Sequence, residues 1–93
     1  MLYAESYSIE VDYEEEMKIL DNVYPDKYSY LTLLQDVYQM FPKFKFDFPI
    51  CILGTGMHIE YDVDIDTMFR KYAKNPYILI SVYERVDLVK ILH

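Results

Sequence analysis

The chain has 93 residues, 53% hydrophobic and 27% charged, which is the composition of one small globular domain and excludes a disordered tail. A single cysteine, Cys51, excludes a fold held by internal disulfides, and no apolar run approaches the length of a membrane helix. The net charge of −7 opposes direct binding of nucleic acid, which requires clustered Lys or Arg.

The N-terminal quarter predicts a β-hairpin. Polar and apolar residues alternate strictly over residues 7–13, which is the pattern of a half-buried strand with one apolar face, made of Tyr7, Ile9, Val11 and Tyr13. The run Glu14–Glu16 predicts a solvated turn. A second apolar stretch over residues 17–24 then pairs antiparallel with the first strand and ends at Pro25.

The pattern changes to a helical period after this hairpin. Apolar residues recur at spacings of three and four, which predicts a helix of about three turns with one buried face: Tyr30, Leu33, Leu34, Val37, Tyr38 and Phe41. Ser29 is a suitable N-cap, because its hydroxyl can accept a hydrogen bond from a first-turn amide. Pro42 ends the helix, since proline disfavours helical geometry in the preceding residue.

Period two returns over residues 43–53, which predicts a strand whose apolar face holds Phe44, Phe46, Phe48, Ile50 and Ile52. Pro49 cannot donate to a ladder, so it lies at the start of the strand or with its nitrogen away from a neighbour. The cluster Gly54–Gly56 predicts a tight turn and lacks the longer glycine pattern of a phosphate loop. Residues 57–61 then predict a short strand.

A second helix follows, capped by Asp62 or Asp64 and stopped by Asn75 and Pro76. Residues 77–83 are a nearly continuous run of β-formers, which is typical of a central strand. We expect a single domain over residues 1–93, with its core over about residues 5–84. Residues 85–93 are an extension that continues the strand, begins a helix, or marks where the chain was cut from a longer protein.

The resulting order is ββαββαβ. This order predicts an α+β fold of the ubiquitin-like β-grasp type, in which one mixed sheet packs on a main helix and the last strand lies beside the first. A ferredoxin-like α+β sandwich is the alternative, with one strand fewer.

Acidic residues form two groups. The first 26 residues hold eight acids against one base, Lys18, so the whole negative excess lies there and includes Glu14, Glu15 and Glu16. In the second group, acids occupy alternate positions: Glu60, Asp62, Asp64 and Asp66. An EF-hand loop that begins at Asp62 would need glycine at its sixth place and glutamate at its twelfth, where Thr67 and Ala73 stand. The second group is therefore a solvated, helix-capping face or an acidic docking patch.

No residue combination indicates catalysis. Cys51 and His58 form a Cys/His pair without an orienting third group, and His58 lacks further His or Cys residues at metal-ligand spacing. We therefore expect no enzyme activity, no metal, no cofactor and no small-molecule substrate. The 11 tyrosines suit either the margin of a core or a protein interface.

The second half of the chain resembles the Phox-and-Bem-one-like domain at the N-terminus of plant Mutator-like transposases. The resemblance covers a strand with a glycine turn (52–56), the stretch Ile59–Phe69 with its Asp-x-Asp-x-x-x-Met-Phe pattern, and a strand that ends at Tyr83. It implies a protein-interaction module that associates with itself or another protein. Family members pair an acidic motif on one domain with a first-strand lysine on another, whereas the nearest base here is Lys18, on the second predicted strand.

Two acidic surfaces are therefore candidates for partner contact. One comprises Glu60, Asp62, Asp64 and Asp66, and the other comprises Glu14, Glu15 and Glu16 beside Lys18. On the first hypothesis, Asp62→Lys with Asp64→Lys would weaken association with little change in melting temperature. The alternative is a small stand-alone acidic inhibitor of viral or phage type that mimics nucleic acid and binds a basic protein surface.

Overall fold

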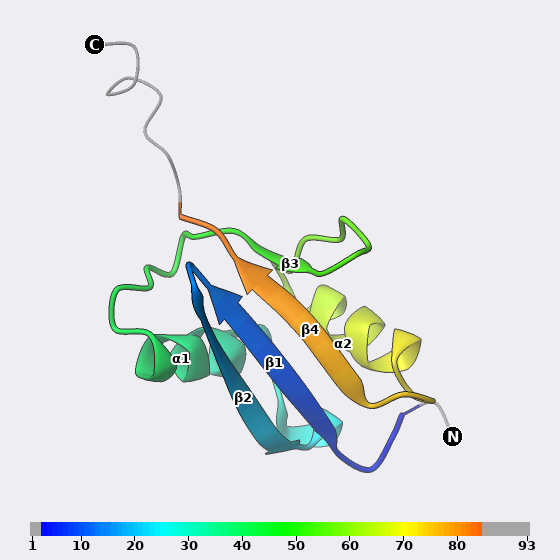
Figure 1. Cartoon of the computed structure of the whole chain (residues 1–93). Coiled ribbons are helices and arrows are strands. Elements are labelled where there is room, and N and C mark those ends of the chain that lie inside the picture. The colour runs from blue at the N-terminus through cyan, green and yellow to red at the C-terminus, as the bar shows by residue number, and fades with distance from the viewer. Residues whose placement is uncertain (1–2, 85–93) are drawn as a thin grey trace, which may run out of the picture.

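The computed structural model describes residues 3–84, which form a four-stranded mixed sheet with two α-helices (Figure 1). The elements in chain order are β1 (Tyr7–Tyr13), β2 (Glu16–Val23), a 3₁₀ turn η1 (Pro25–Lys27), α1 (Tyr30–Met40), β3 (Ile50–Ile52), α2 (Asp62–Lys71) and β4 (Tyr77–Val82). The expectation for residues 85–93 lies outside the described residues. No helix within residues 3–84 is both long and apolar enough to cross a membrane.

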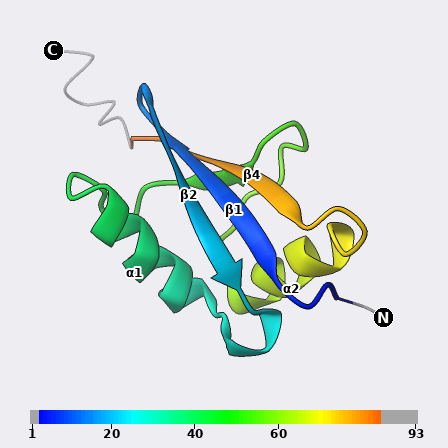
Figure 2. The same cartoon turned by 60° about the horizontal axis from the view of Figure 1, so that its bottom comes forward.

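The strand order is β2-β1-β4-β3. β1 pairs antiparallel with β2 and parallel with β4, and β3 pairs antiparallel with β4. The last strand is therefore central and lies beside the first, as predicted. Both helices cover the same face of the sheet, so the opposite face has no helix over it (Figure 2).

The alternation in β1 has the predicted consequence. The side chains of Tyr7, Ile9, Val11 and Tyr13 are buried between the sheet and the helices, whereas the residues between them are half-buried on the opposite face. α1 begins as predicted, because the Ser29 hydroxyl accepts a hydrogen bond from the Thr32 amide at 3.1 Å.

The prediction of a strand from Lys43 is wrong, because β3 contains only Ile50, Cys51 and Ile52. Phe44 and Phe48 are buried, but Phe46 between them is exposed. These rings pack on other aromatic rings, with Phe48 6.2 Å from Tyr13 and 5.9 Å from Phe44 between centroids. Aromatic contacts thus replace a β-ladder in this segment. Pro49 directly precedes β3, in agreement with its predicted place.

Gly54 and Gly56 both have positive φ, at 81° and 71°, and form the predicted turn. The strand predicted over residues 57–61 is wrong, since it is reduced to one bridge between Cys51 and His58. The predicted cap of α2 also needs correction. Tyr61 occupies the N-cap position, and Asp64 instead reaches back to its amide from the third helical residue.

Candidate functional site

The β1–β2 turn presents the first acidic group to solvent. Glu14 and Glu15 form a two-residue turn between the paired residues Tyr13 and Glu16, and all three glutamates are exposed. Glu14 has φ of 55°, which is the left-handed region that tight hairpins require at a central position. The short turn therefore holds three carboxylates together at one end of the sheet.

Glu84 joins this group, although the sequence interpretation did not include it. The parallel register pairs Tyr13 with Val82, so the residues that follow β4 lie beside the hairpin turn. The Tyr13 hydroxyl donates a hydrogen bond to Glu84 Oε1 at 3.0 Å. We call Glu14, Glu15, Glu16 and Glu84 the hairpin-end surface. The signal that could have revealed Glu84 is the expected pairing of the last strand with the first.

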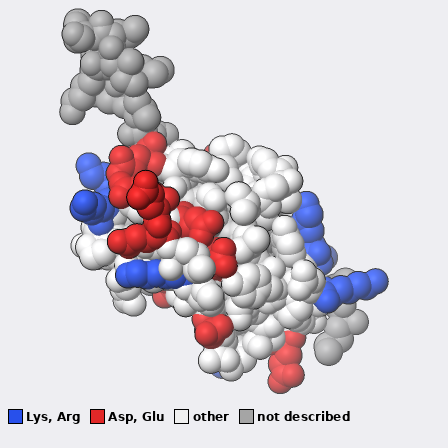
Figure 3. Space-filling model, in the orientation of Figure 1, with Lys and Arg blue, Asp and Glu red and all other residues white. Residues whose placement is uncertain are grey.

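Proton affinities are shifted within the hairpin-end surface. Burial and the hydrogen bond to Glu84 raise the pKa of Tyr13 to about 12. The pKa of Glu14 is raised because its carboxyl group shares a hydrogen bond with Glu84, with smaller effects of burial and of the negative charge of Glu84. A hollow of about 460 Å³ opens here, lined by Asp12, Glu14, Ser81, Val82, Tyr83 and Glu84. The sheet end thus carries a concentrated negative charge (Figure 3).

Lys18 lies on the helix-covered side of the sheet and does not line this hollow. Its partner across the hairpin is Val11, whose side chain faces the helices. The Lys18 ammonium donates to the Met40 carbonyl at 2.7 Å and lies 5.2 Å from the centre of the Phe41 ring. It therefore neutralises the C-terminal end of α1, where a cation is favoured.

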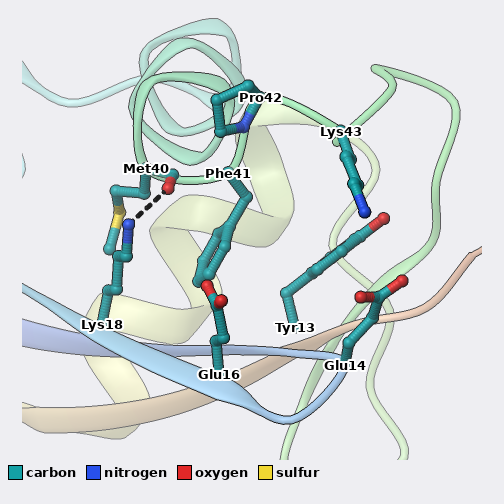
Figure 4. A pocket seen from close by; sticks show the side chains of 8 residues that line it. All are labelled: Tyr13, Glu14, Glu16, Lys18, Met40, Phe41, Pro42 and Lys43. Atoms are coloured by element: carbon teal, nitrogen blue, oxygen red, sulfur yellow. Dashed lines mark hydrogen bonds between the residues drawn. The ribbon is translucent and has the colours of Figure 1, made fainter.

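A groove of about 190 Å³ surrounds this lysine, between the hairpin turn and the end of α1 (Figure 4). Lys43 points into it toward Tyr13 and Glu14, and the positive charge of Lys43 partly offsets the rise in the Glu14 pKa. The groove therefore holds both charge signs, unlike the hollow beyond the sheet end.

The second acidic group is largely used within the fold. Asp62 accepts a hydrogen bond from the Tyr30 amide at 2.8 Å, which joins the starts of the two helices. Asp64 accepts from the Glu60 and Tyr61 amides at 2.9 and 3.0 Å. The carboxylate of Glu60 is exposed and accepts no hydrogen bond within residues 3–84.

Asp66 also has internal partners. It forms an ion pair of 2.8 Å with Arg70 one helical turn later, and it accepts a hydrogen bond from the Tyr3 hydroxyl. Hydrogen bonding to Tyr3 and the charge of Asp66 raise the pKa of Arg70. The structure therefore places Asp62, Asp64 and Asp66 in the first turns of α2, as predicted. Their carboxylates cap the helix and form contacts with Tyr30, Tyr3 and Arg70.

Cys51 and His58 do come together at the glycine turn. The Cys51 sulfur lies 3.4 Å from His58 Nδ1, while burial raises the pKa of the thiol, which favours its protonated, weakly nucleophilic form. In the described part of the chain, no three His, Cys, Asp or Glu residues group so as to hold a metal ion. The pair is thus a local contact in an edge bridge.

No family model matches the chain, and no curated protein matches it. Among solved structures, it is similar to a chain described as "AtNBR1-PB1 domain", with a TM-score of 0.71 and 13% sequence identity. The match covers 88% of this chain and 100% of the other. At this identity the likeness establishes the fold: the chain has the ubiquitin-like β-grasp fold of a PB1 domain, which confirms the predicted fold class.

Proposed function

We propose that the chain is a non-catalytic module for protein–protein association, either with itself or with another protein. The PB1-like fold supports this proposal, as does the sequence resemblance to interaction domains of plant Mutator-like transposases. The finer proposal of a transposase-related origin rests on that sequence resemblance, of which the stretch Ile59–Phe69 is the most telling part.

The observation that carries the proposal is the difference between the two acidic groups. Three of the four carboxylates near α2 already accept hydrogen bonds from their own fold. In the hairpin-end surface, by contrast, the exposed carboxylates of Glu15 and Glu16 accept none from residues 3–84. These carboxylates are free to meet a cationic partner group without losing a contact within the fold, so the hairpin-end surface is the favoured contact.

Glu60, Asp62, Asp64 and Asp66 form a second, weaker candidate. Their outward oxygens can still meet a basic partner, but such contact would compete with the Tyr30, Tyr61 and Arg70 interactions. We therefore assign them first to the stability of the fold. Lys18 is assigned to the end of α1 rather than to a partner, because its ammonium already bonds to Met40.

Association is tested with a charge-matched pair of triple variants in the full chain. One reverses Glu14, Glu15 and Glu16 to Lys, and the other reverses the exposed residues Glu5, Asp26 and Asp47 to Lys, which lie outside both acidic groups. Sedimentation velocity measures self-association, and pull-down with mass spectrometry identifies other partners. We expect the hairpin triple variant to lose association and the control to retain it.

Two outcomes would contradict this assignment. Equal loss in both variants would show that only net charge matters. Unchanged association of the hairpin triple variant would exclude its three glutamates as the contact. Raised salt should also weaken association of the unmodified chain, because exposed charges are screened over about 10 Å at moderate ionic strength.

A further inference from the structure

The face of the sheet opposite the helices carries acidic and exposed apolar side chains. The register places pairs of residues on it: Glu10 lies between Ile19 on β2 and Leu79 on β4, and Asp12 lies between Met17 and Ser81. We call this surface the open face. Figure 3 views it directly, with acidic side chains toward the hairpin end and uncharged atoms over much of the remainder.

The open face is apolar as well as acidic. Met17 and Ile19 are 53% and 46% exposed, and they lie two residues apart on the same side of β2. Tyr77 at the start of β4 is also exposed, and its hydroxyl bonds to Glu10 at 2.8 Å. Adjacent exposed apolar side chains of this kind are typical of a contact surface, whereas scattered ones are ordinary.

The charged residues at the strand positions of the open face are all acidic. Its strand positions include Glu10, Asp12 and Asp21 and no Lys or Arg, because the only base in β2, Lys18, points toward α1. Asp12 accepts no hydrogen bond within residues 3–84. A suitable partner therefore supplies Lys or Arg beside apolar side chains, and an anionic lipid surface would be repelled.

Backbone geometry selects the shape of that partner. The central strands β1 and β4 have strands on both sides, so an occupant of the open face meets side chains rather than free backbone groups. Strands lie about 4.8 Å apart, so the distance from β2 to β4 is about 10 Å, which matches the width of an α-helix. A helix lying along β2 can place its apolar stripe against Met17 and Ile19, with its basic flank over Glu10 and Asp12 on β1.

We propose that the open face binds a basic amphipathic helix of a partner protein, with apolar residues on Met17 and Ile19 and basic residues on Glu10 and Asp12. This site goes beyond the hairpin-end proposal, since it requires the exposed apolar residues of β2 and none of the three turn glutamates.

The probe is a synthetic peptide of about 14 residues, or four helical turns, with Leu at helical spacing and Lys elsewhere. A scrambled peptide of the same composition is its control. The test variant of the full chain is Met17→Lys with Ile19→Lys. Its matched control is Leu31→Lys with Val63→Lys, which adds the same charge at two helix residues that are 57% and 65% exposed.

We expect fluorescence anisotropy to show that the patterned peptide binds about tenfold more tightly than the scrambled one, equivalent to about 1.4 kcal/mol. The test variant should lose this preference and the control should keep it. NMR shifts on peptide binding should concentrate on β1, β2 and β4.

Equal binding of the two peptides, or equal loss in the two variants, would overturn the proposal. NMR shifts confined to the turn at residues 14–16 would also overturn it, while leaving the hairpin-end proposal intact. Conversely, if the hairpin triple variant still binds the patterned peptide but no longer associates with its own partner, the two sites are separate.

Discussion

The double substitution Asp62→Lys with Asp64→Lys should destabilise the fold, contrary to the expectation from sequence alone. The structure shows why. Asp62 accepts the Tyr30 amide, and Asp64 accepts two amides at the start of α2, so three backbone donors lose charged partners. Two lysines would also stand at the positive end of the helix.

The magnitude follows from these contacts. Loss of a capping side chain costs about 1 kcal/mol, and the hydrogen bond to Tyr30 and the reversed helix-end charges add about 1–2 kcal/mol. We therefore expect a loss of about 2–3 kcal/mol in the free energy of unfolding. For a domain of this size, that corresponds to a fall of roughly 10–20 °C in melting temperature.

A control variant separates hydrogen bonding from net charge. Glu15→Lys with Glu60→Lys makes the same change in net charge, but neither carboxylate accepts a hydrogen bond within residues 3–84. Its melting temperature should stay near that of the unmodified chain. Asp64→Asn should retain most stability, because its side-chain oxygen can still cap the helix. Circular dichroism melts of all three variants give the test, and equal melting temperatures for the two double variants would refute the reasoning.

Two further predictions concern the hairpin end. Because the folded-state pKa of Tyr13 is raised from 10.0 to about 12, its contribution to stability is complete below pH 10 and is lost as pH rises toward 12. In Tyr13→Phe, the free energy of unfolding measured by urea denaturation should fall less between pH 10 and pH 12 than in the unmodified chain. An equal fall in both proteins would contradict this prediction. Glu14→Gly should raise the melting temperature, because glycine adopts φ of 55° without strain, whereas Glu15→Gly should lower it. A matching fall in both glycine variants would contradict the assigned turn geometry.

Strong periodicity explains which elements the sequence could predict. β1 and α1 each have one apolar face, and the nearly continuous apolar run of β4 indicated the central strand that the sheet order confirms. Alternation misled for residues 43–49, since the side chains of Phe44 and Phe48 find ring partners in the core instead of a neighbouring strand. Alternation of apolar and polar residues shows which side chains can share a buried face, but it does not show whether a partner strand is available.

The acidic residues could be located from sequence, but their roles could not. Asp62 and its partner Tyr30 are far apart in the chain, so their hydrogen bond depends on how the two helices are placed. The cap at Tyr61 was missed because tyrosine is not a preferred N-cap residue, although an acid at the third helical position is a known signal. Glu84 reaches the hairpin only through the parallel register of β1 and β4.

The antiparallel register also explains how a single lysine leaves one face of the sheet acidic. Successive residues of a strand point to opposite faces, so Lys18 faces α1 while its neighbours Met17 and Ile19 face outward. A shift of one residue in the pairing would place Lys18 beside Glu10 or Asp12 and remove the one-sided charge. The two-residue turn at Glu14 and Glu15 fixes this register. The same short turn that gathers the hairpin-end carboxylates therefore also directs Lys18 toward α1 and away from Glu10 and Asp12.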